Sequence, residues 1–285
     1  MTIAVTGATG QLGRLVLDEL LTSQEPDSLV AVVRDGAKAG ELAARGVQVR
    51  VADYSDPAAL EAALTGVDRL LLVSGSEVGA RVAQHGNVID AAKAAGVGFI
   101  AYTSVLAADT TELILAPEHK ATEELIRASG LGFTFLRNGW YTENYAQTVA
   151  TAKQTGAVVA AAGDGRVASA TRADYAAAAA AVLSSAGHEG RTYELSGDYA
   201  WDFKELATAL TRITGREVVY QPVSAPELVE VLTTAGLDAG TAGFLAALDA
   251  DTEAGLLATV TGELSRLIGR PTTPLLQALT SAAAS

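Results

Sequence analysis

A strand, a glycine turn and a helix follow one another at the start of the chain. Residues 2–6 form a β-branched run with the length of a buried strand, and Gly7, Gly10 and Gly13 separate it from an amphipathic run over 14–21. Gly7 would allow a tight turn, Gly10 would let the backbone approach a pyrophosphate, and Gly13 would let the helix pack against the sheet. The pyrophosphate would lie on the free N–H groups of the helix N-terminus. The pattern predicts a dinucleotide-binding turn, although glycine turns also follow strands that bind no ligand.

The second predicted strand, over residues 28–34, ends in an arginine. Dinucleotide-binding folds place here, about 20 residues after the glycine turn, the side chain that contacts the adenosine ribose. An acid at this point accepts from a free 2′-hydroxyl, whereas a guanidinium forms charge-assisted hydrogen bonds with a 2′-phosphate. Arg34 therefore favours NADPH over NADH. The adjacent acid Asp35 weakens this preference, and an exposed arginine at a strand end is the alternative.

Strands and helices continue to alternate through the first half of the chain, which predicts an α/β fold with a Rossmann-type parallel sheet and helices on both of its faces. Beyond residue 145 the alternation loosens. We expect an NADP-binding Rossmann domain over residues 1–145, with residues 166–190 packing back on it. Residues 146–285 would form a smaller, mostly helical α/β C-terminal lobe that closes over the cofactor cleft and binds the substrate. Further strands are predicted over residues 47–52, 69–73, 99–103, 133–137, 192–195 and 218–222.

Polar or small residues follow the predicted strands, at the sheet edge where ligands bind in this architecture. Asp53 could accept a hydrogen bond from the adenine amino group, or it could serve only as a turn residue. Residues 74–76, with the sequence Ser-Gly-Ser, leave room for the cofactor. The polar and aromatic loop over 138–144 suits the nicotinamide half and the substrate. Within it, Trp140 and Tyr141 could stack on a flat acceptor ring or wedge the two lobes together.

Composition and charge exclude several classes of protein. The absence of cysteine excludes disulfides, thiolate metal sites, iron–sulfur clusters and a cysteine nucleophile, and the three histidines and unclustered carboxylates predict no metal site. The formal net charge of −13 argues against binding to nucleic acid or anionic membranes, so Arg34 and Lys38 are candidates for a locally positive entrance for an anionic cofactor. The longest apolar run, over residues 175–183, is far shorter than the roughly 20 residues of a membrane helix. Because no secretory signal precedes the first strand, we expect a soluble, cytoplasmic protein.

Six short segments together resemble the NmrA-like group of atypical short-chain dehydrogenases/reductases, over essentially the full length of the chain. Within that group the sequence is similar to the bacterial type 2 NAD(P)H:quinone oxidoreductases, with the triphenylmethane reductases as near relatives. The serine-rich segment after the fourth strand and the loop after the sixth are the more specific of these segments. The segments are residues 5–13, 31–34, 74–79, 99–104, 136–141 and 169–175.

The resemblance implies a division of labour among the residues that would bind NADPH. It implies that Arg34 binds the 2′-phosphate and that Arg172 also reaches the ligand. It gives the diphosphate to Gly7, Ala8, Thr9, Gly10, Gln11 and Leu12. It gives the central cleft to Ser74, Gly75, Ser76, Asn138, Gly139, Trp140, Tyr141, Thr142 and Glu143.

One departure from the larger superfamily bears on the mechanism. Typical short-chain dehydrogenases carry a tyrosine, which protonates a carbonyl oxygen, four residues before a lysine. Here the lysine in the corresponding helix is Lys120, and Ala116 stands four residues before it. An unactivated ketone needs a proton as hydride arrives, which argues against ordinary alcohol dehydrogenation. A quinone instead yields a stabilised hydroquinone anion that water can protonate, so cofactor, pocket and orientation would suffice without a flavin.

The sequence assigns no residue to catalysis. Lys120, Asn138 and Tyr141 are the candidates. His119 could help Lys120 as a polar group, but a histidine beside a lysine is more typical of a solvated helix face. We therefore expect NADPH-dependent two-electron reduction of a small-molecule quinone or other flat aromatic acceptor, by a chain that could also form an oligomer. The alternatives are a triarylmethane-dye or other NADPH reductase on the same scaffold, and a non-enzymatic NmrA-like NADP(H) sensor.

Overall fold

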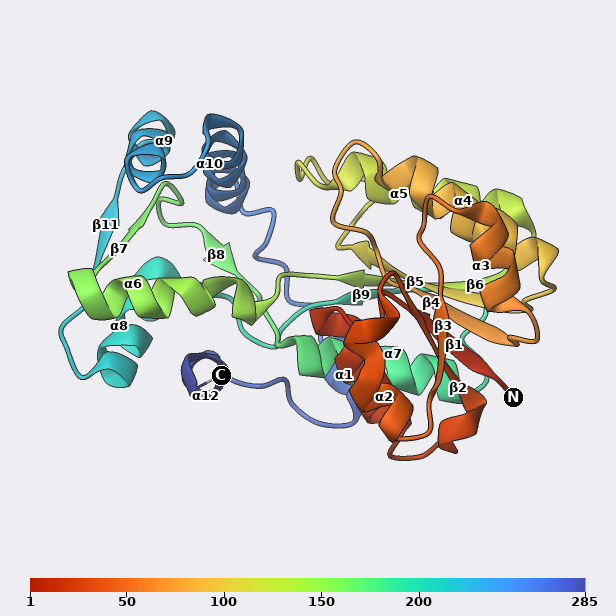
Figure 1. Cartoon of the computed structure of the whole chain (residues 1–285). Coiled ribbons are helices and arrows are strands. Elements are labelled where there is room, and N and C mark those ends of the chain that lie inside the picture. Colours follow the sequence, from red (N-terminus) through yellow and green to blue (C-terminus); the bar gives the residue numbers. More distant parts are fainter. Residues whose placement is uncertain (285) are drawn as a thin grey trace. The chain divides into compact units, whose positions relative to one another are not determined.

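The computed structural model describes residues 1–284, which divide into two compact units (Figure 1). Unit 1 comprises Met1–Asp109, Leu115–Asn138 and Arg172–Leu195. Unit 2 comprises Thr110–Ile114, Gly139–Thr171 and the chain from Ser196 onward. The domain boundary that we expect at residue 145 stays a prediction.

Unit 1 is built on a parallel sheet in which the described residues place seven strands, in the order β3-β2-β1-β4-β5-β6-β9. This arrangement confirms the predicted Rossmann-type fold. The strands are β1 (Ile3–Thr6), β2 (Leu29–Val33), β3 (Gln48–Val51), β4 (Arg69–Leu72), β5 (Phe99–Val105), β6 (Gly132–Asn138) and β9 (Arg191–Leu195).

Helices cover both faces of this sheet (Figure 1). On one face lie α3 (Pro57–Leu64), α4 (Arg81–Ala94) and α5 (Ala116–Ser129). On the other face α1 (Gln11–Leu20) packs against α7 (Arg172–Ser184). The short elements η1 (Pro26–Ser28), η2 (Gly36–Ala39) and α2 (Gly40–Ala44) connect β2 with its neighbours. The core beneath α3, α4 and α5 consists of buried apolar side chains, among them Val30, Leu60, Leu70, Val88, Ile100 and Ile126.

Local sequence signals set the ends of these helices. The Asp56 side chain caps α3 by accepting a hydrogen bond from the backbone N–H of Ala59 at 3.0 Å, and Pro57 occupies the first turn. Gly130 ends α5 in the left-handed region, with φ of +80°. An aspartate followed by proline and a C-terminal glycine are the residues that typically begin and end helices.

The strand β9 differs from what the sequence analysis expected. The analysis assigned a strand over 192–195 to the C-terminal lobe, but β9 pairs with β6, with Arg137 opposite Glu194. After its excursion into unit 2 the chain returns through α7 and extends the sheet of unit 1. The residues of a short strand do not indicate which strand it pairs with, so the sequence pattern did not reveal the partner of β9.

A buried ionic cluster joins β5, β6, β9 and α5. The Arg137 guanidinium, 5% exposed, binds both oxygens of Glu123 at 2.8 and 2.9 Å and reaches Glu194 at 2.7 Å and Asp109 at 2.8 Å. Ser104 donates to Glu123 at 2.7 Å. Burial alone would lower the pKa of Arg137, but the three carboxylates outweigh burial and raise it. The cluster therefore fixes the carboxyl ends of three strands relative to one helix.

Arg137→Met should lower the free energy of unfolding by about 3–5 kcal/mol, because it leaves the buried Glu123 carboxylate without its partner. The control is Arg45→Met, since Arg45 pairs with Asp18 on the exposed surface of the same unit, and it should cost less than about 1 kcal/mol. Urea unfolding of both variants measures the difference. Equal losses of unfolding free energy in the two variants would show that the cluster stabilises the protein no more than an ordinary surface ion pair does.

Unit 2 contains two small sheets together with helices. Parallel β7 and β11 form one small sheet and antiparallel β8 and β10 another. Trp201 and Phe203 are buried in unit 2, with exposed fractions of 2% and 4%. Its elements are η3 (Thr142–Tyr145), α6 (Ala146–Thr155), β7 (Ala157–Ala160), β8 (Arg166–Val167), β10 (Trp201–Asp202), α8 (Phe203–Thr214), β11 (Val219–Pro222), α9 (Ala225–Thr234), α10 (Ala239–Glu253), α11 (Glu263–Ile268) and α12 (Leu275–Ala284).

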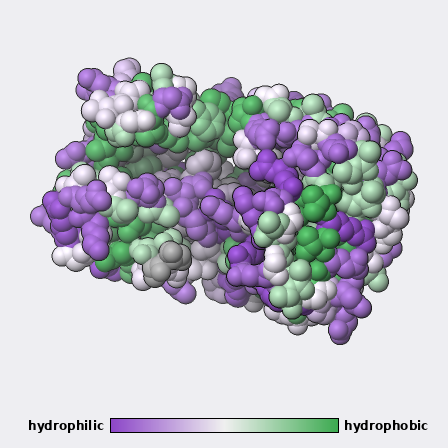
Figure 2. Space-filling view, in the orientation of Figure 1, coloured by the Kyte–Doolittle hydropathy of each residue, from purple (hydrophilic) through white to green (hydrophobic). Residues whose placement is uncertain are grey.

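The surface of unit 1 and the lengths of the helices bear on contact with water and with membranes. Figure 2 shows a face of unit 1 on which hydrophobic side chains lie in small groups among hydrophilic ones, as is usual for a water-exposed face. Among the helices of residues 1–284, none combines the length and the apolar character that crossing a bilayer requires.

Candidate functional site

The carboxyl ends of β1, β2, β3 and β4 meet at one edge of the sheet in unit 1. Strand β1 pairs with β2 on one side and with β4 on the other, so the strand order reverses at β1. Open parallel sheets bind their ligands at such a switch point, outside the carboxyl ends of the strands. The turn after β1 and the segment after β4 border this point.

The glycine turn has the close contacts that a dinucleotide-binding turn requires. Gly7 has φ of +57°, and its carbonyl accepts a hydrogen bond from Gly10 N–H at 2.8 Å. A Cβ on Gly13 would lie 2.4 Å from the Gly7 oxygen and 2.9 Å from the Gly7 carbonyl carbon. The sequence analysis expected Gly13 to make room for the sheet, but its nearest neighbour is the backbone of the turn itself. The missing side chain thus lets α1 begin directly against the turn.

The first turn of α1 is suited to an anion. Gly10 caps the helix, and within the described part of the chain no side chain caps it and no acid stands in its first turn. The first N–H groups of the helix therefore remain for a ligand, and the helix dipole favours negative charge there. Ala8 and Leu12 are buried, while Gln11 is exposed. These observations fit a bound diphosphate.

Gly13→Ala should weaken NADPH binding at least about tenfold and lower stability by about 1–3 kcal/mol, because the added methyl displaces α1 from the turn. Gly40→Ala is the control, since Gly40 begins α2 with φ of −55° and a Cβ there would meet open space. The control should be neutral or stabilising. Fluorescence titration with NADPH and urea unfolding measure both effects; unchanged NADPH binding in a folded Gly13 variant would contradict the role given to the turn.

Arg34 and Asp35 follow β2 and have different partners. The Asp35 carboxylate accepts from the backbone N–H of Ala37 at 3.0 Å and caps η2, so it has a local role. The Arg34 side chain is 70% exposed, and its guanidinium lies 3.4 Å from the carboxylate of Glu77. An exposed pair of this kind is weak and can give way to a phosphate. Lys38 is also exposed, in η2.

The residues after β3 include one that the sequence analysis missed. Asp53 accepts from the hydroxyl and backbone N–H of Ser55, which hold the pKa of its carboxyl below the usual value; this is a turn role, and adenine binding stays a prediction. The Tyr54 hydroxyl lies 2.5 Å from Thr6 Oγ1 and 2.9 Å from the carbonyl oxygen of Val73, beneath the glycine turn. Burial raises the pKa of Tyr54, so it remains a neutral phenol that links β1 to β4.

Buried side chains hold the segment after β4. The N–H of Ser74 donates to Thr103 Oγ1 at 2.8 Å, and the N–H of Gly75 donates to His85 Nε2 at 2.9 Å. Arg81 Nε donates to the Gly75 carbonyl at 2.7 Å. Ser74 and Gly75, which the sequence analysis placed at the cofactor, are therefore fixed by β5 and α4.

The far end of this segment is bound to α5. The Glu118 carboxylate accepts from Gly79 N–H at 2.8 Å and from Arg81 Nη1 at 2.9 Å. Arg81 has a side chain only 7% exposed, so it forms a largely buried ion pair. One arginine thus connects both ends of the segment.

The histidines of α4 and α5 lie inside the protein. The sequence analysis expected His119 on a solvated face, but it is 6% exposed and its Nδ1 lies 2.8 Å from the Tyr102 hydroxyl, while its neighbour Lys120 is exposed. His85 is fully buried. Burial, followed by the charge of Arg81, lowers the pKa of both histidines to about 3. Both rings are therefore neutral at physiological pH.

The free energy of unfolding should fall as pH drops from about 6.5 toward 5. In this range the unfolded chain protonates His85 and His119 while the folded protein does not, so each histidine contributes a slope of about 1.4 kcal/mol per pH unit. Carboxylates titrate mostly below this range. Urea unfolding at pH 7.5, 6 and 5 measures the slope, and His119→Gln should remove the contribution of one histidine from it. A flat profile would contradict neutral, buried histidines.

The remaining predicted residues lie at the end of β6, at the start of α7 and in unit 2. Asn138 ends β6 with a buried side chain, and Arg172 begins α7; both belong to unit 1. In unit 2, Thr142 N–H donates to the carbonyl of Ala170 at 2.9 Å, and Ala170 N–H donates to the carbonyl of Trp140 at 3.0 Å. These backbone bonds fix the course of the loop. Gly139, Trp140, Tyr141 and Glu143 are half-buried.

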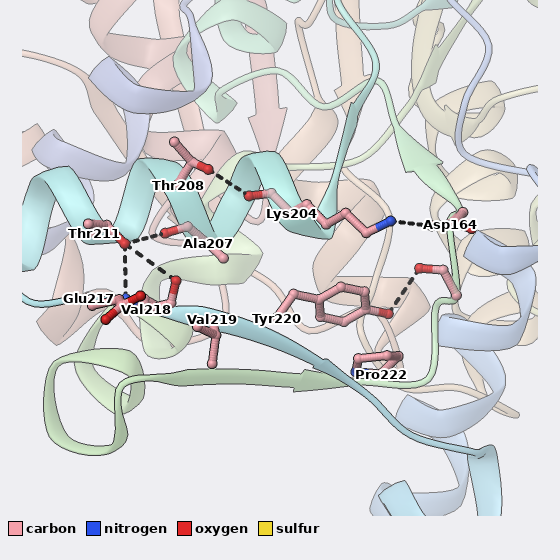
Figure 3. A pocket seen from close by; sticks show the side chains of 11 residues that line it. Asp164, Lys204, Ala207, Thr208, Thr211, Glu217, Val218, Val219, Tyr220 and Pro222 are labelled. Carbon is pink, nitrogen blue, oxygen red and sulfur yellow. Dashed lines mark hydrogen bonds and ion pairs between the residues drawn. The ribbon is translucent and has the colours of Figure 1, made fainter.

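A cavity of about 550 Å³ lies elsewhere in unit 2, between α8 and β11 (Figure 3). Its polar groups bind one another: Lys204 pairs with Asp164 at 2.8 Å, and the Tyr220 hydroxyl donates to the Gly163 carbonyl at 3.0 Å. The residues that line it differ from the predicted site residues. The cavity therefore has no part in the site predicted at the sheet edge.

The strand order, the glycine turn and the uncapped helix define a dinucleotide-binding protein of the Rossmann type. More particularly, the chain belongs to the NmrA-like family, whose model matches residues 1–249.

Characterised relatives are similar over nearly the whole chain. This chain is 53% identical over 277 residues to quinone oxidoreductase 2 of Escherichia coli (strain K12), and the match covers 97% of both chains. A crystal structure of an NADPH-dependent quinone oxidoreductase from Escherichia coli in complex with NADPH matches with a TM-score of 0.95 at 53% identity, covering 98% of this chain and 99% of that one. The triphenylmethane reductase of Citrobacter sp. matches with a TM-score of 0.96 at 40% identity over the full length of both chains.

Proposed function

We propose that this protein is an NADPH-dependent oxidoreductase that reduces quinones by two electrons through direct hydride transfer. The observation that carries the proposal is the 53% identity, over 97% of both chains, to quinone oxidoreductase 2 of Escherichia coli. The fold agreement with a quinone oxidoreductase that was solved with NADPH supports both the cofactor and the reaction.

The residues of unit 1 would hold the adenosine and diphosphate parts of NADPH. The turn from Gly7 to Gly13 presents backbone N–H groups to the diphosphate, and Arg34 neutralises the 2′-phosphate. The segment over 74–76 borders the path of the cofactor along the sheet edge. When bound, NADPH supplies a hydride from its nicotinamide ring.

The chain's own groups then orient the acceptor instead of protonating it. Ala116 stands where typical relatives in the superfamily have tyrosine, and Lys120 is exposed. A quinone that accepts a hydride, and with it two electrons, becomes a hydroquinone monoanion, which takes its proton from water. Proximity and orientation therefore account for catalysis.

The acceptor site is proposed for the loop over 139–143 in unit 2. Trp140 and Tyr141 are half-buried aromatic side chains that can stack on a flat ring. Asn138, Glu143 and Arg172 complete the proposed contacts with the cofactor and the acceptor. A cytoplasmic location belongs to the same proposal, and an oligomer is compatible with it.

The activity is tested by following NADPH oxidation at 340 nm with a benzoquinone or naphthoquinone, and again with NADH, after subtracting the uncatalysed rate. Quinone-dependent oxidation that favours NADPH is expected. A triphenylmethane dye is included because a dye reductase is 40% identical to the chain. Turnover with the dye but not with the quinones would show that the acceptor is a dye and not a quinone. Tight NADPH binding without any turnover would overturn the enzyme proposal in favour of a sensor.

Arg34→Ala should raise the KM for NADPH about 10- to 100-fold, because a charge-assisted hydrogen bond to the 2′-phosphate is lost, and should leave the KM for NADH nearly unchanged. Lys93→Ala removes an exposed charge near the end of α4 and serves as the control for net charge. Initial-rate kinetics with both cofactors measure the effect. Equal increases for NADPH and NADH would refute the assignment of Arg34.

A further inference from the structure

The peptide groups on both sides of Gly75 are fixed by two buried side chains of α4. His85 Nε2 accepts from Gly75 N–H at 2.9 Å, and Arg81 Nε donates to the Gly75 carbonyl at 2.7 Å. The exposed fractions are 0% for His85 and 6% for Arg81, so both side chains are held inside the protein. The site residues that the sequence predicts include Gly75 but neither of these partners.

The hydrogen bonds around His85 admit only one form of its ring. Because Nε2 accepts from Gly75 N–H, it carries no hydrogen. The ring hydrogen is then on Nδ1 and donates to Thr122 Oγ1 at 3.0 Å. Thr122 Oγ1 in turn donates to the Glu118 carbonyl at 2.8 Å, so it can accept from the ring. His85 is a neutral ring with a defined acceptor directed at Gly75.

Fixing these two peptide groups also fixes the groups opposite to them. In a planar trans peptide the N–H and the C=O point in opposite directions, and the structure has no cis peptide bond within the described residues. With Gly75 N–H directed at His85, the Ser74 carbonyl points away from His85. With the Gly75 carbonyl directed at Arg81, the Ser76 N–H points away from Arg81. The segment therefore presents one acceptor and one donor on its side away from α4.

We infer that His85 is a positioning residue, which with Arg81 sets the Ser74 carbonyl and the Ser76 N–H as an acceptor and donor pair for the cofactor. The matching ligand group has a donor beside an acceptor, as do a carboxamide and a pair of ribose hydroxyls. The inference rests on the proposed function, because it takes the cofactor to pass along this edge. His85 acts through the Gly75 peptide and does not touch the cofactor.

Two substitutions at position 85 separate the two hydrogen bonds of the ring. The Oε1 atom of His85→Gln reaches the place of Nε2 and can accept from Gly75 N–H. The side chain of His85→Asn reaches only the place of Nδ1, so it keeps the contact with Thr122 and leaves Gly75 N–H unpaired. We expect His85→Gln to keep the Kd for NADPH within about threefold, and His85→Asn to raise it about tenfold or more.

The matched control is the same pair of substitutions at His188, whose ring bonds Tyr193 at 2.7 Å and Ser185 at 2.9 Å. Both control variants should bind NADPH as the wild type does. Urea unfolding of all four variants shows whether the difference between Gln and Asn at position 85 exceeds any difference in stability. Equal Kd values for His85→Gln and His85→Asn would overturn the inference.

Amide hydrogen exchange at Gly75, measured by NMR without NADPH, tests the positioning independently of the proposed function. We expect slow exchange in the wild type and in His85→Gln, and exchange at least about tenfold faster in His85→Asn, because only the last leaves the amide unpaired. Fast exchange in the wild type would overturn the inference even if neither variant folds. A wild type that has a protected Gly75 amide but does not bind NADPH would refute the proposed function and leave the positioning of the segment standing.

Discussion

The close approach of α1 to the backbone of the first turn determines where the ligand site can lie. Because a Cβ at position 13 would lie only 2.4 Å from the Gly7 oxygen, only glycine lets the helix start at this point. The helix N-terminus then lies at the strand-order reversal between β1 and β4, where the Tyr54 hydroxyl and Thr6 connect the two strands. Packing therefore places the helix N-terminus at the sheet edge, where we propose that the diphosphate binds.

Local patterns predicted the parts of the protein that depend on neighbours in the sequence. The glycine turn, the Asp56 cap of α3, the Gly130 end of α5 and the buried Trp201 are all readable from a few adjacent residues. The contacts of His85 with Gly75 and Thr122 span 10 and 37 residues, and no periodicity indicates them. The same holds for the Arg137 cluster, whose carboxylate partners come from α5, β9 and the loop after β5, and for the pairing of β9 with β6.

The arginine side chains of this acidic protein differ in their burial and in their partners. Arg81 and Arg137 are themselves buried and form ion pairs with carboxylates, whereas Arg34 is exposed at the sheet edge and lies 3.4 Å from Glu77. An exposed guanidinium remains mobile enough to bind a phosphate, and a buried one stiffens the fold. The buried histidines stay neutral and add no charge near the cofactor path. In the proposed function, cofactor choice depends on Arg34, whereas Arg81 and Arg137 stabilise the fold.

The central claim is direct hydride transfer from bound NADPH to a quinone, and a single-turnover experiment tests it most directly. The protein–NADPH complex is mixed rapidly with a naphthoquinone and followed at 340 nm. The account predicts loss of one equivalent of NADPH per site, at a rate that rises with quinone concentration and slows when the transferred hydrogen is deuterium. Loss of NADPH only at the uncatalysed rate, or only after a flavin is added, would contradict it.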